Sequence, residues 1–195
     1  MALGNRGGKR HNKSVISVII PTLNDAARLP RTLAPLVLGV AEGLVKQAII
    51  ANGPSTDDTA AVAEAAGCDV IEAGAKRGQQ LRAGARAAKG IWLLFLRAGA
   101  ELAEGWLGET RRFVEGDRNC AAAFRLATTD ASARSVQVLR ALMKRPLAEQ
   151  GLLISRALYE KVGGYHDMDS AHEDLIRRIG ARRLIILRAA IGFSD

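Results

Sequence analysis

The stretch SVISVIIPTLND, residues 14–25, combines three local signals that define the start of a fold. Residues 14–20 form a continuous run rich in β-branched side chains, which predicts a strand buried on both faces. Pro21 ends this run because proline has no backbone N–H to donate to a sheet. Asn24 and Asp25 then offer side-chain oxygens that could cap a following helix, which we expect to extend to about Val40.

The same alternation of strand and helix continues along the first hundred residues. We expect strands at 47–51, 69–73 and 91–96, and helices at 59–66 and 77–88. Such βαβ units predict an α/β fold, a single Rossmann-like domain with a mainly parallel mixed sheet and helices on both faces. The second half is less regular, with helices expected at 104–116, 133–144, 156–162 and 173–179 and strands at 121–126, 152–155 and 184–187.

Ligands of such sheets bind beyond the carboxyl ends of the strands. The loops to inspect are therefore residues 21–25, 51–57, 74–80 and 97–101, which we expect to share one edge of the sheet. We predict one domain over residues 14–195, with a nucleotide-binding half at 14–101 and an acceptor half at 102–195. Residues 1–13 are predicted to be a disordered basic tail.

The composition limits the classes of partner. The formal net charge is +8, which favours anionic partners such as nucleotides, phosphates or an anionic membrane face. Neither a secretory signal nor an apolar run long enough to span a membrane is visible. Aromatic residues make up only 4%, and no nucleic-acid motif is present, so no nucleic-acid partner is expected. We predict a cytoplasmic bacterial protein, either free or peripheral on the inner face of the membrane.

One segment keeps two interpretations open. Residues 133–146 place apolar side chains at helical spacing beside a set of basic ones. They predict either an ordinary amphipathic helix on the core or an interfacial helix that faces anionic lipid.

Five stretches, taken in order, resemble the family 2 inverting glycosyltransferases with the GT-A fold. They are SVIIPTLND, IIANGPSTDDT, KGIWLLFLRAGAELAEGWL, EQGLLISRALYEKVGGY and HEDLIRR. The resemblance covers roughly residues 14–188 and is closest to small stand-alone members. It implies an enzyme that transfers a sugar from a nucleotide-sugar donor to an acceptor. An interfacial helix at residues 133–146 would fit an acceptor that is linked to a lipid.

The resemblance also implies where the nucleotide binds. The first loop would fix the backbone and bond a base or ribose, the second would bond the base, and the basic third loop would bind phosphate oxygens. The residues concerned are Pro21, Thr22, Asn24, Asp25, Asn52, Ser55, Asp57, Lys76, Arg77 and Gly78. Helix capping is an equally acceptable role for Asn24, Ser55 and Asp57.

The fourth loop departs from the family pattern. Gly99 stands where the family has a metal-binding aspartate, and Arg97 stands two residues before it. Glycine offers no carboxylate to Mg²⁺ or Mn²⁺, and Glu101 alone would make a poor site. Two interpretations remain. In the first, Arg97 replaces the metal with the help of Lys76 or Arg77. In the second, the site is inactive and the fold is kept for nucleotide binding alone. The sequence therefore predicts no metal site, and it leaves Mg²⁺ or Mn²⁺ open as the alternative.

An inverting transfer needs a base on the acceptor side. Glu173 and Asp174 are the adjacent acids of that segment, and Asp174 matches the family in either of two alignments. We therefore predict Asp174 as the base and Glu173 as its alternative, while a cap pair at a helix N-terminus is the structural interpretation. His166 and His172 are expected at the surface.

Overall fold

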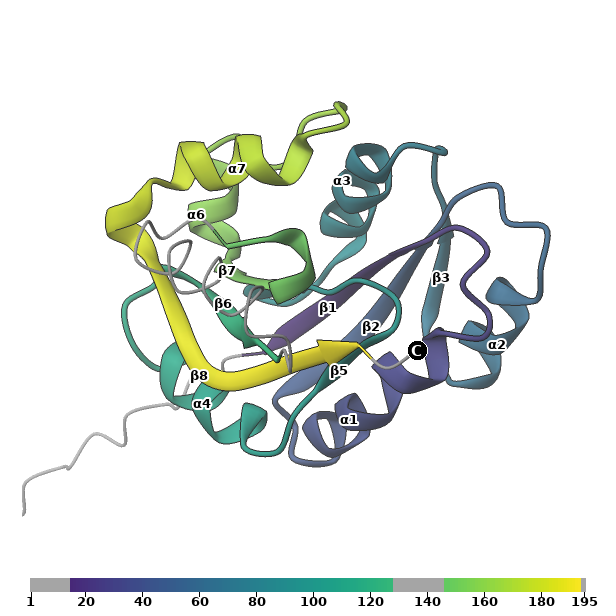
Figure 1. Ribbon diagram of the computed structural model, residues 1–195, viewed down its shortest axis with the longest axis horizontal. Coiled ribbons are helices and arrows are strands. Elements are labelled where there is room, and N and C mark those ends of the chain that lie inside the picture. Colours follow the sequence, from purple (N-terminus) through teal and green to yellow (C-terminus); the bar gives the residue numbers. More distant parts are fainter. Residues whose placement is uncertain (1–14, 128–145, 194–195) are drawn as a thin grey trace, which may run out of the picture.

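The computed structural model describes residues 15–127 and 146–193. The predicted basic tail and segment 133–145 lie outside these residues. The first half contains β1 (Ile16–Thr22), α1 (Leu29–Ala41), β2 (Val45–Asn52), α2 (Thr59–Ala65), β3 (Asp69–Glu72), α3 (Arg77–Ala87) and β4 (Trp92–Phe95). The second half contains β5 (Ala100–Leu102), α4 (Trp106–Val114), β6 (Ala121–Leu126), η1 (Ala148–Gln150), β7 (Leu152–Ser155), α6 (Arg156–Lys161), α7 (Ala171–Ile179), η2 (Ala181–Arg183) and β8 (Leu184–Phe193) (Figure 1).

The described strands form one mixed sheet in the order β3-β2-β1-β4-β7-β6-β8-β5. Strands β3, β2, β1 and β4 are parallel to one another, whereas β7 is antiparallel to both β4 and β6. Central Ile19 is aligned with Ile49 on one side and Phe95 on the other. The predicted α/β domain with a mixed, largely parallel sheet is confirmed.

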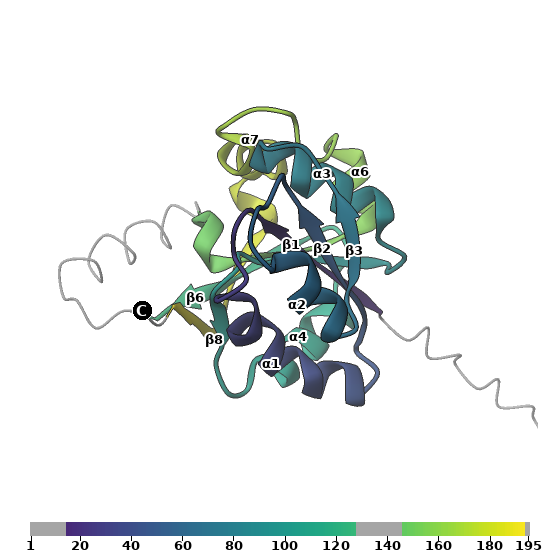
Figure 2. The same cartoon turned by 90° about the vertical axis from the view of Figure 1, so that its right-hand side faces the viewer.

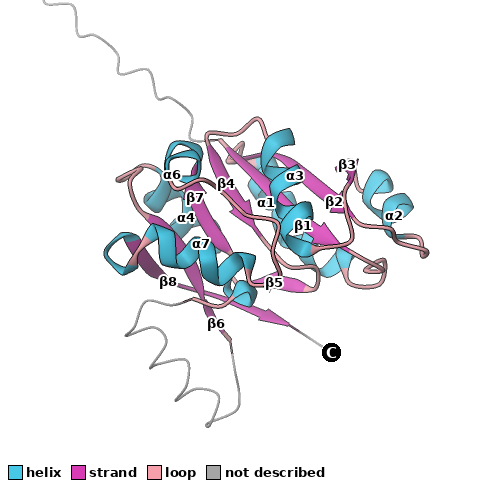
Figure 3. Cartoon of the chain, turned by 90° about the horizontal axis from the view of Figure 1, so that it is seen from above, coloured by secondary structure: helices cyan, strands magenta, loops and turns pink. Residues whose placement is uncertain are grey.

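Helices cover both faces of the sheet, as the sequence predicts. Val18 and Ile20 of β1 belong to a hydrophobic cluster that includes residues of α1 and α4. Ile19, which points the opposite way because side chains alternate along a strand, belongs to a second cluster with α3, α6 and α7. Figures 2 and 3 show α3, α6 and α7 together on one side of the sheet. Among the described helices, none is long and apolar enough to cross a membrane.

Three local expectations are wrong. Pro21 does not end the first strand, because β1 continues through Pro21 to Thr22, which are aligned with Ala51 and Asn52 of β2. Asn24 and Asp25 do not cap α1, which begins only at Leu29 with Arg28 at the N-cap position and no side-chain cap. Pro30 in the first turn accounts for this later start, because proline is well suited to the beginning of a helix. The three-residue strand β5 was not expected, since it depends on antiparallel pairing with distant β8.

Candidate functional site

The four inspected loops lie at one edge of the sheet because β1 to β4 are parallel. The first two loops are joined by side chains that the sequence had suggested for nucleotide binding. Asn24 Oδ1 accepts a hydrogen bond from the Thr56 backbone N–H at 2.8 Å, and Asn24 N–H donates to Ser55 Oγ at 3.0 Å. Asn52 Oδ1 accepts from the hydroxyls of Thr22 at 3.0 Å and Ser55 at 2.7 Å. These side chains therefore hold the two loops together.

The acids of the same loops also have internal partners. Asp57 accepts from the hydroxyl and backbone N–H of Thr59 and from the backbone N–H of Ala26. The bond from the Thr59 hydroxyl holds the pKa of Asp57 below its ordinary value, against the opposing effect of burial. Asp25 accepts from the Leu23 backbone N–H at 3.0 Å and pairs with Arg28 at 3.2 Å. Asp57 therefore joins the first loop to the start of α2, and Asp25 stabilises the first loop.

The third loop divides its predicted residues between different roles. Arg77, the first residue of α3, lines both of the pockets described below. Lys76 is exposed and lines neither pocket. A Cβ at Gly78 would lie 2.4 Å from the backbone oxygen of His166. Gly78 therefore allows α3 to pack closely against the backbone of residues 166–168. This packing explains the glycine without the phosphate-binding role that the sequence suggested.

Two adjoining pockets lie at this edge of the sheet. The loop pocket is lined by Leu23, Asp25, Arg28, Ala75, Arg77, Gln80 and Arg97. The α7 pocket has a volume of about 120 Å³ and is lined in part by Pro21, Phe95, Leu152, Tyr165, Asp169, His172 and Glu173. Arg77 and Arg97 line both pockets. The two guanidinium groups therefore mark the junction between the pockets.

These two arginines make the junction electropositive. The pKa of Arg77 is lowered, first by partial burial and then by the charge of Arg97. Arg97 pairs with Glu149 of η1 at 3.0 Å and lies 5.8 Å from the centre of the Phe193 ring. Within residues 15–127 and 146–193, Arg77 has no carboxylate at ion-pair distance. The charges of Asp25 and Glu149 act on Arg77 in the opposite direction and balance part of this repulsion. Paired N–H donors of two neighbouring guanidinium groups suit the oxygens of a phosphate.

The fourth loop offers a divalent cation only one carboxylate, that of Glu101. Gly99 has a φ of +88°, which glycine adopts freely, and its N–H donates to Thr32 Oγ1 at 2.8 Å. In the part of the chain that the structure describes, no three His, Cys, Asp or Glu side chains gather to hold a metal. A permanent guanidinium at Arg97 is also an unfavourable neighbour for a divalent cation. The described side chains therefore form no cluster of metal ligands at this loop.

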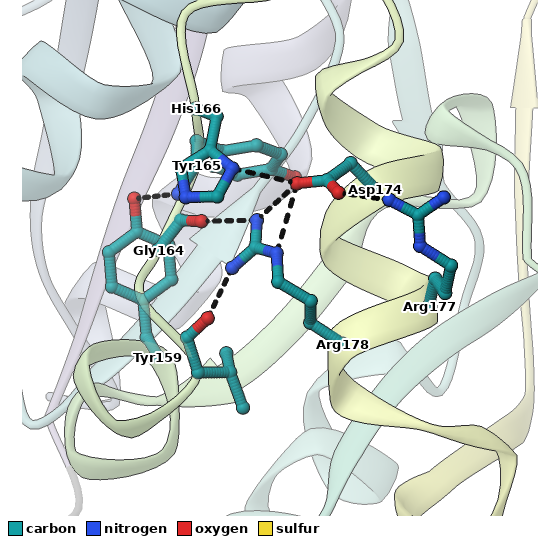
Figure 4. Close-up of polar contacts among 8 residues, drawn as sticks. Tyr159, Gly164, Tyr165, His166, Asp174, Arg177 and Arg178 are labelled. Carbon is teal, nitrogen blue, oxygen red and sulfur yellow. Dashed lines mark hydrogen bonds and ion pairs between the residues drawn. The ribbon is translucent and has the colours of Figure 1, made fainter.

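Asp174 is held in a cluster of cations (Figure 4). Its Oδ2 accepts from Arg178 Nε at 2.9 Å and Nη2 at 2.7 Å, and His166 Nδ1 lies 3.0 Å from the same oxygen. Arg177 pairs with Oδ1. Arg178, first among these groups, lowers the pKa of Asp174. A carboxylate stabilised in this way is a weak base, and Asp174 is not among the residues that line either pocket.

The same arginine connects α7 to the Gly-Gly segment before it. Arg178 donates to the backbone oxygens of Val162 and Gly164, the latter at 2.6 Å. The Tyr159 hydroxyl accepts from the Tyr165 backbone N–H at 3.0 Å. The Asp174 cluster therefore fixes the segment that brings Tyr165 into the α7 pocket. This geometry is against the predicted role of Asp174 as base and supports a structural one.

Glu173 and His172 differ from Asp174 in their surroundings. Glu173 lines the α7 pocket and is exposed. His172 is buried, so its expected surface position is wrong, and burial lowers its pKa. His172 Nε2 lies 3.2 Å from the Pro146 carbonyl and Nδ1 lies 3.3 Å from the Tyr165 hydroxyl. A neutral ring that donates to the carbonyl and accepts from the tyrosine satisfies both contacts.

Several residues of the site were not predicted from the sequence. Gln80 follows Arg77 by three positions on α3, so the helical repeat could have indicated that both share a face. Glu149 and Asp169 had no local signal, because only the packing of η1 and the 165–170 segment brings them to the sheet edge.

The Asp174 cluster gives a prediction about acid stability. A carboxyl group whose folded pKa is lowered stabilises the fold above its unfolded pKa, and this stabilisation is lost as pH falls through the folded pKa. Asp174→Asn should therefore be less stable than the unmodified protein at pH 7. The difference should shrink below about pH 4. Urea unfolding of both proteins at pH 7, 5 and 3 measures it, and an equal difference at pH 7 and pH 3 would contradict the ionic origin.

Comparison with known proteins identifies the family and supports the fold. The sequence model of glycosyl transferase family 2 matches residues 17–180. No functionally curated protein matches the chain significantly. Two solved structures of glucosyl-3-phosphoglycerate synthase from Mycobacterium tuberculosis share the fold. The complex with Mn²⁺, UDP and phosphoglyceric acid has a TM-score of 0.70 at 18% identity, over 93% of this chain and 71% of that one.

The second is the complex with Mn²⁺, UDP and glucosyl-3-phosphoglycerate, which has a TM-score of 0.68 at 19% identity, over 93% of this chain and 72% of that one. At such identities the likeness establishes the fold alone. The family match spans most of the chain and includes the loops of both pockets. The chain therefore belongs to glycosyl transferase family 2.

Proposed function

We propose that this enzyme transfers a sugar from a nucleoside-diphosphate sugar to an acceptor hydroxyl, with the donor diphosphate bound by Arg77 and Arg97. The observation that supports this most directly is the position of the two guanidinium groups at the junction of the two pockets. Burial and mutual repulsion lower the pKa of Arg77 when no anion is present. A diphosphate between the two groups would relieve that repulsion.

The two pockets suit the two substrates. The loop pocket, between the loops that follow β1 and β3, would hold the nucleoside. The α7 pocket, which contains the carboxylates of Asp169 and Glu173, would hold the acceptor. The bond between sugar and diphosphate would then lie near Arg77 and Arg97. As the sugar–oxygen bond breaks, the arginines would stabilise the negative charge that develops on the leaving diphosphate.

We also propose that metal dependence is weak or absent. The similar synthase structures contain Mn²⁺ together with UDP. In this chain Gly99 contributes no side chain, and Arg97 places a permanent positive charge beside it. Fixed guanidinium groups can neutralise a diphosphate without a cation, because arginine binds phosphate oxygens with paired N–H donors.

For the base we propose Glu173 in place of Asp174. Glu173 faces the α7 pocket and is not drawn into the ion pairs that occupy Asp174. Its carboxylate would accept the proton of the acceptor hydroxyl while that oxygen attacks the anomeric carbon. The acceptor is proposed to be lipid-linked, because the net charge of +8 would favour contact of the protein with an anionic membrane surface.

The experiment that tests the function is calorimetry of UDP, CDP, GDP and ADP in the presence of EDTA. At least one nucleoside diphosphate should bind without metal, and its affinity should fall as salt rises because the contacts to Arg77 and Arg97 are partly exposed. Adding Mn²⁺ should change that affinity little. Binding that requires Mn²⁺ would contradict the arginine proposal, and binding of none of the four would contradict the donor class itself.

A further inference from the structure

Gln80 is a buried helix residue whose amide nitrogen lacks a partner. Its side chain is only 3% exposed, and no group of the described chain accepts a hydrogen bond from Nε2. Buried polar groups are almost always paired, so an unpaired one requires an explanation. Two other buried polar atoms of the described residues are unpaired, on Trp92 and Thr110, but neither residue lines the two pockets. Gln80 does line the loop pocket.

The surroundings of the amide are built by two loops. A Cβ at Gly53 would lie 2.5 Å from Gln80 Nε2, 3.3 Å from the Thr22 backbone oxygen and 3.4 Å from a methyl group of Leu23. Gly53 therefore leaves the space that the amide occupies. The Thr22 oxygen already accepts from the Gly53 backbone N–H at 2.8 Å. The amide thus lies where the loops after β1 and β2 meet above α3.

The lining of the loop pocket has the composition of a nucleoside diphosphate site. Leu23 and Ala75 provide apolar contact for a flat ring, and Arg77 and Arg97 provide positive charge for phosphates. The remaining charges of the lining, Asp25 and Arg28, pair with each other at 3.2 Å. Between the loops, Gln80 contributes a neutral amide, which can donate a hydrogen bond and accept another. An amide N–H left unpaired in the free protein gains a full hydrogen bond when a ligand supplies an acceptor.

We propose that Gln80 selects the base of the donor nucleotide by donating its amide N–H to a ring carbonyl oxygen. The inference rests on the proposed function, because it places the nucleoside in the loop pocket. Uracil offers two ring carbonyls, whereas adenine offers none. The enzyme should therefore prefer a uridine donor over an adenosine donor, and Gln80 should be the source of that preference.

The test compares UDP, ADP and inorganic pyrophosphate by calorimetry, with the unmodified protein, Gln80→Leu and a matched control, Gln79→Leu. Gln79 is the neighbouring residue, and its amide is paired with Asp167 at 2.8 Å outside both pockets. In Gln80→Leu, UDP affinity should fall roughly tenfold, the loss of one net hydrogen bond. Its affinity for pyrophosphate and for ADP should stay within about twofold of the unmodified protein. Gln79→Leu should bind all three ligands like the unmodified protein.

A stability measurement separates base selection from a structural role. Replacing an unpaired buried amide by an apolar side chain of similar size should leave the melting temperature of the free protein unchanged or higher. A lower melting temperature together with equal losses for all three ligands would contradict the proposal. Gly53→Ala provides a second variant, because its methyl group would displace the amide. Gly53→Ala too should lower the affinity for UDP more than the affinity for pyrophosphate.

Two kinds of failure are distinguishable. If UDP binds and Gln80→Leu binds it equally well, or if the unmodified protein binds ADP as tightly as UDP, the base-selection proposal is wrong while the donor class stands. If neither pyrophosphate nor any nucleotide binds the unmodified protein, the proposed function is wrong and the base-selection proposal falls with it.

Discussion

Glu173→Gln should lower the rate of sugar transfer by roughly 10²- to 10⁴-fold, the usual range for loss of a general base. The amide keeps the size of the side chain but cannot accept the acceptor's proton. Affinity for the donor nucleotide should stay the same, because Glu173 lines the α7 pocket and does not line the loop pocket. Initial rates of nucleoside diphosphate release, with the donor and acceptor that the unmodified enzyme uses, measure the effect, and calorimetry measures donor affinity.

Two further variants make this result specific. Glu160→Gln changes an exposed glutamate of α6 and should leave the rate unchanged. Asp169→Asn removes the other carboxylate of the α7 pocket and should have a smaller effect than Glu173→Gln. If Asp169→Asn abolishes transfer while Glu173→Gln remains active, the role of base belongs to Asp169.

Arg77→Gln and Arg97→Gln should each weaken nucleoside diphosphate binding by at least about tenfold in EDTA, because each removes a charge-assisted hydrogen bond. The double variant should lose roughly 10²-fold or more. Arg77→Gln should not destabilise the free protein, because Arg77 is repelled by Arg97 when no anion is bound. Arg97→Gln should cost little stability, because the ion pair that it removes, with Glu149, is largely exposed. Calorimetry gives the affinities, and thermal unfolding gives the stabilities.

The matched control for charge is Arg82→Gln, an exposed arginine of α3 that does not line either pocket. It changes the net charge by the same amount and should bind like the unmodified protein. Equal affinities for the control and both single variants would contradict the diphosphate site, because the effect would then be one of overall charge.

The strands and helices of the first half follow from local signals, which is why the sequence predicts them well. The apolar run before Pro21 forms most of β1, which continues to Thr22, and α2 and α3 begin at the residues expected for them. Strand β5 is different, because three residues carry too little pattern to distinguish a strand from a turn. Its partner β8 lies about ninety residues later in the chain and extends to Phe193.

In the candidate site, too, some features follow from the sequence and others depend on the folded structure. The sequence indicates that Pro21, Arg77 and Arg97 lie at one edge, because parallel strands end on the same side. It does not show that Asn24 and Asn52 use their side-chain oxygens to join two loops. Those bonds depend on the distance between the ends of β1 and β2, which no single segment specifies.

Glu173 and Asp174 illustrate the limit most clearly. They are neighbours of the same chemical type, and neighbouring residues of a helix point about 100° apart. By itself the sequence determined the α/β fold, the edge of the sheet that forms the site, and the positive charge at that edge, because periodicity, proline and formal charge are local properties. The spacing of Asp174 and Arg178 also allows a local ion pair on one helix. Only the tertiary structure decided that His166 joins this pair while Glu173 faces the pocket, because that arrangement depends on how α7 is rotated against the segment before it.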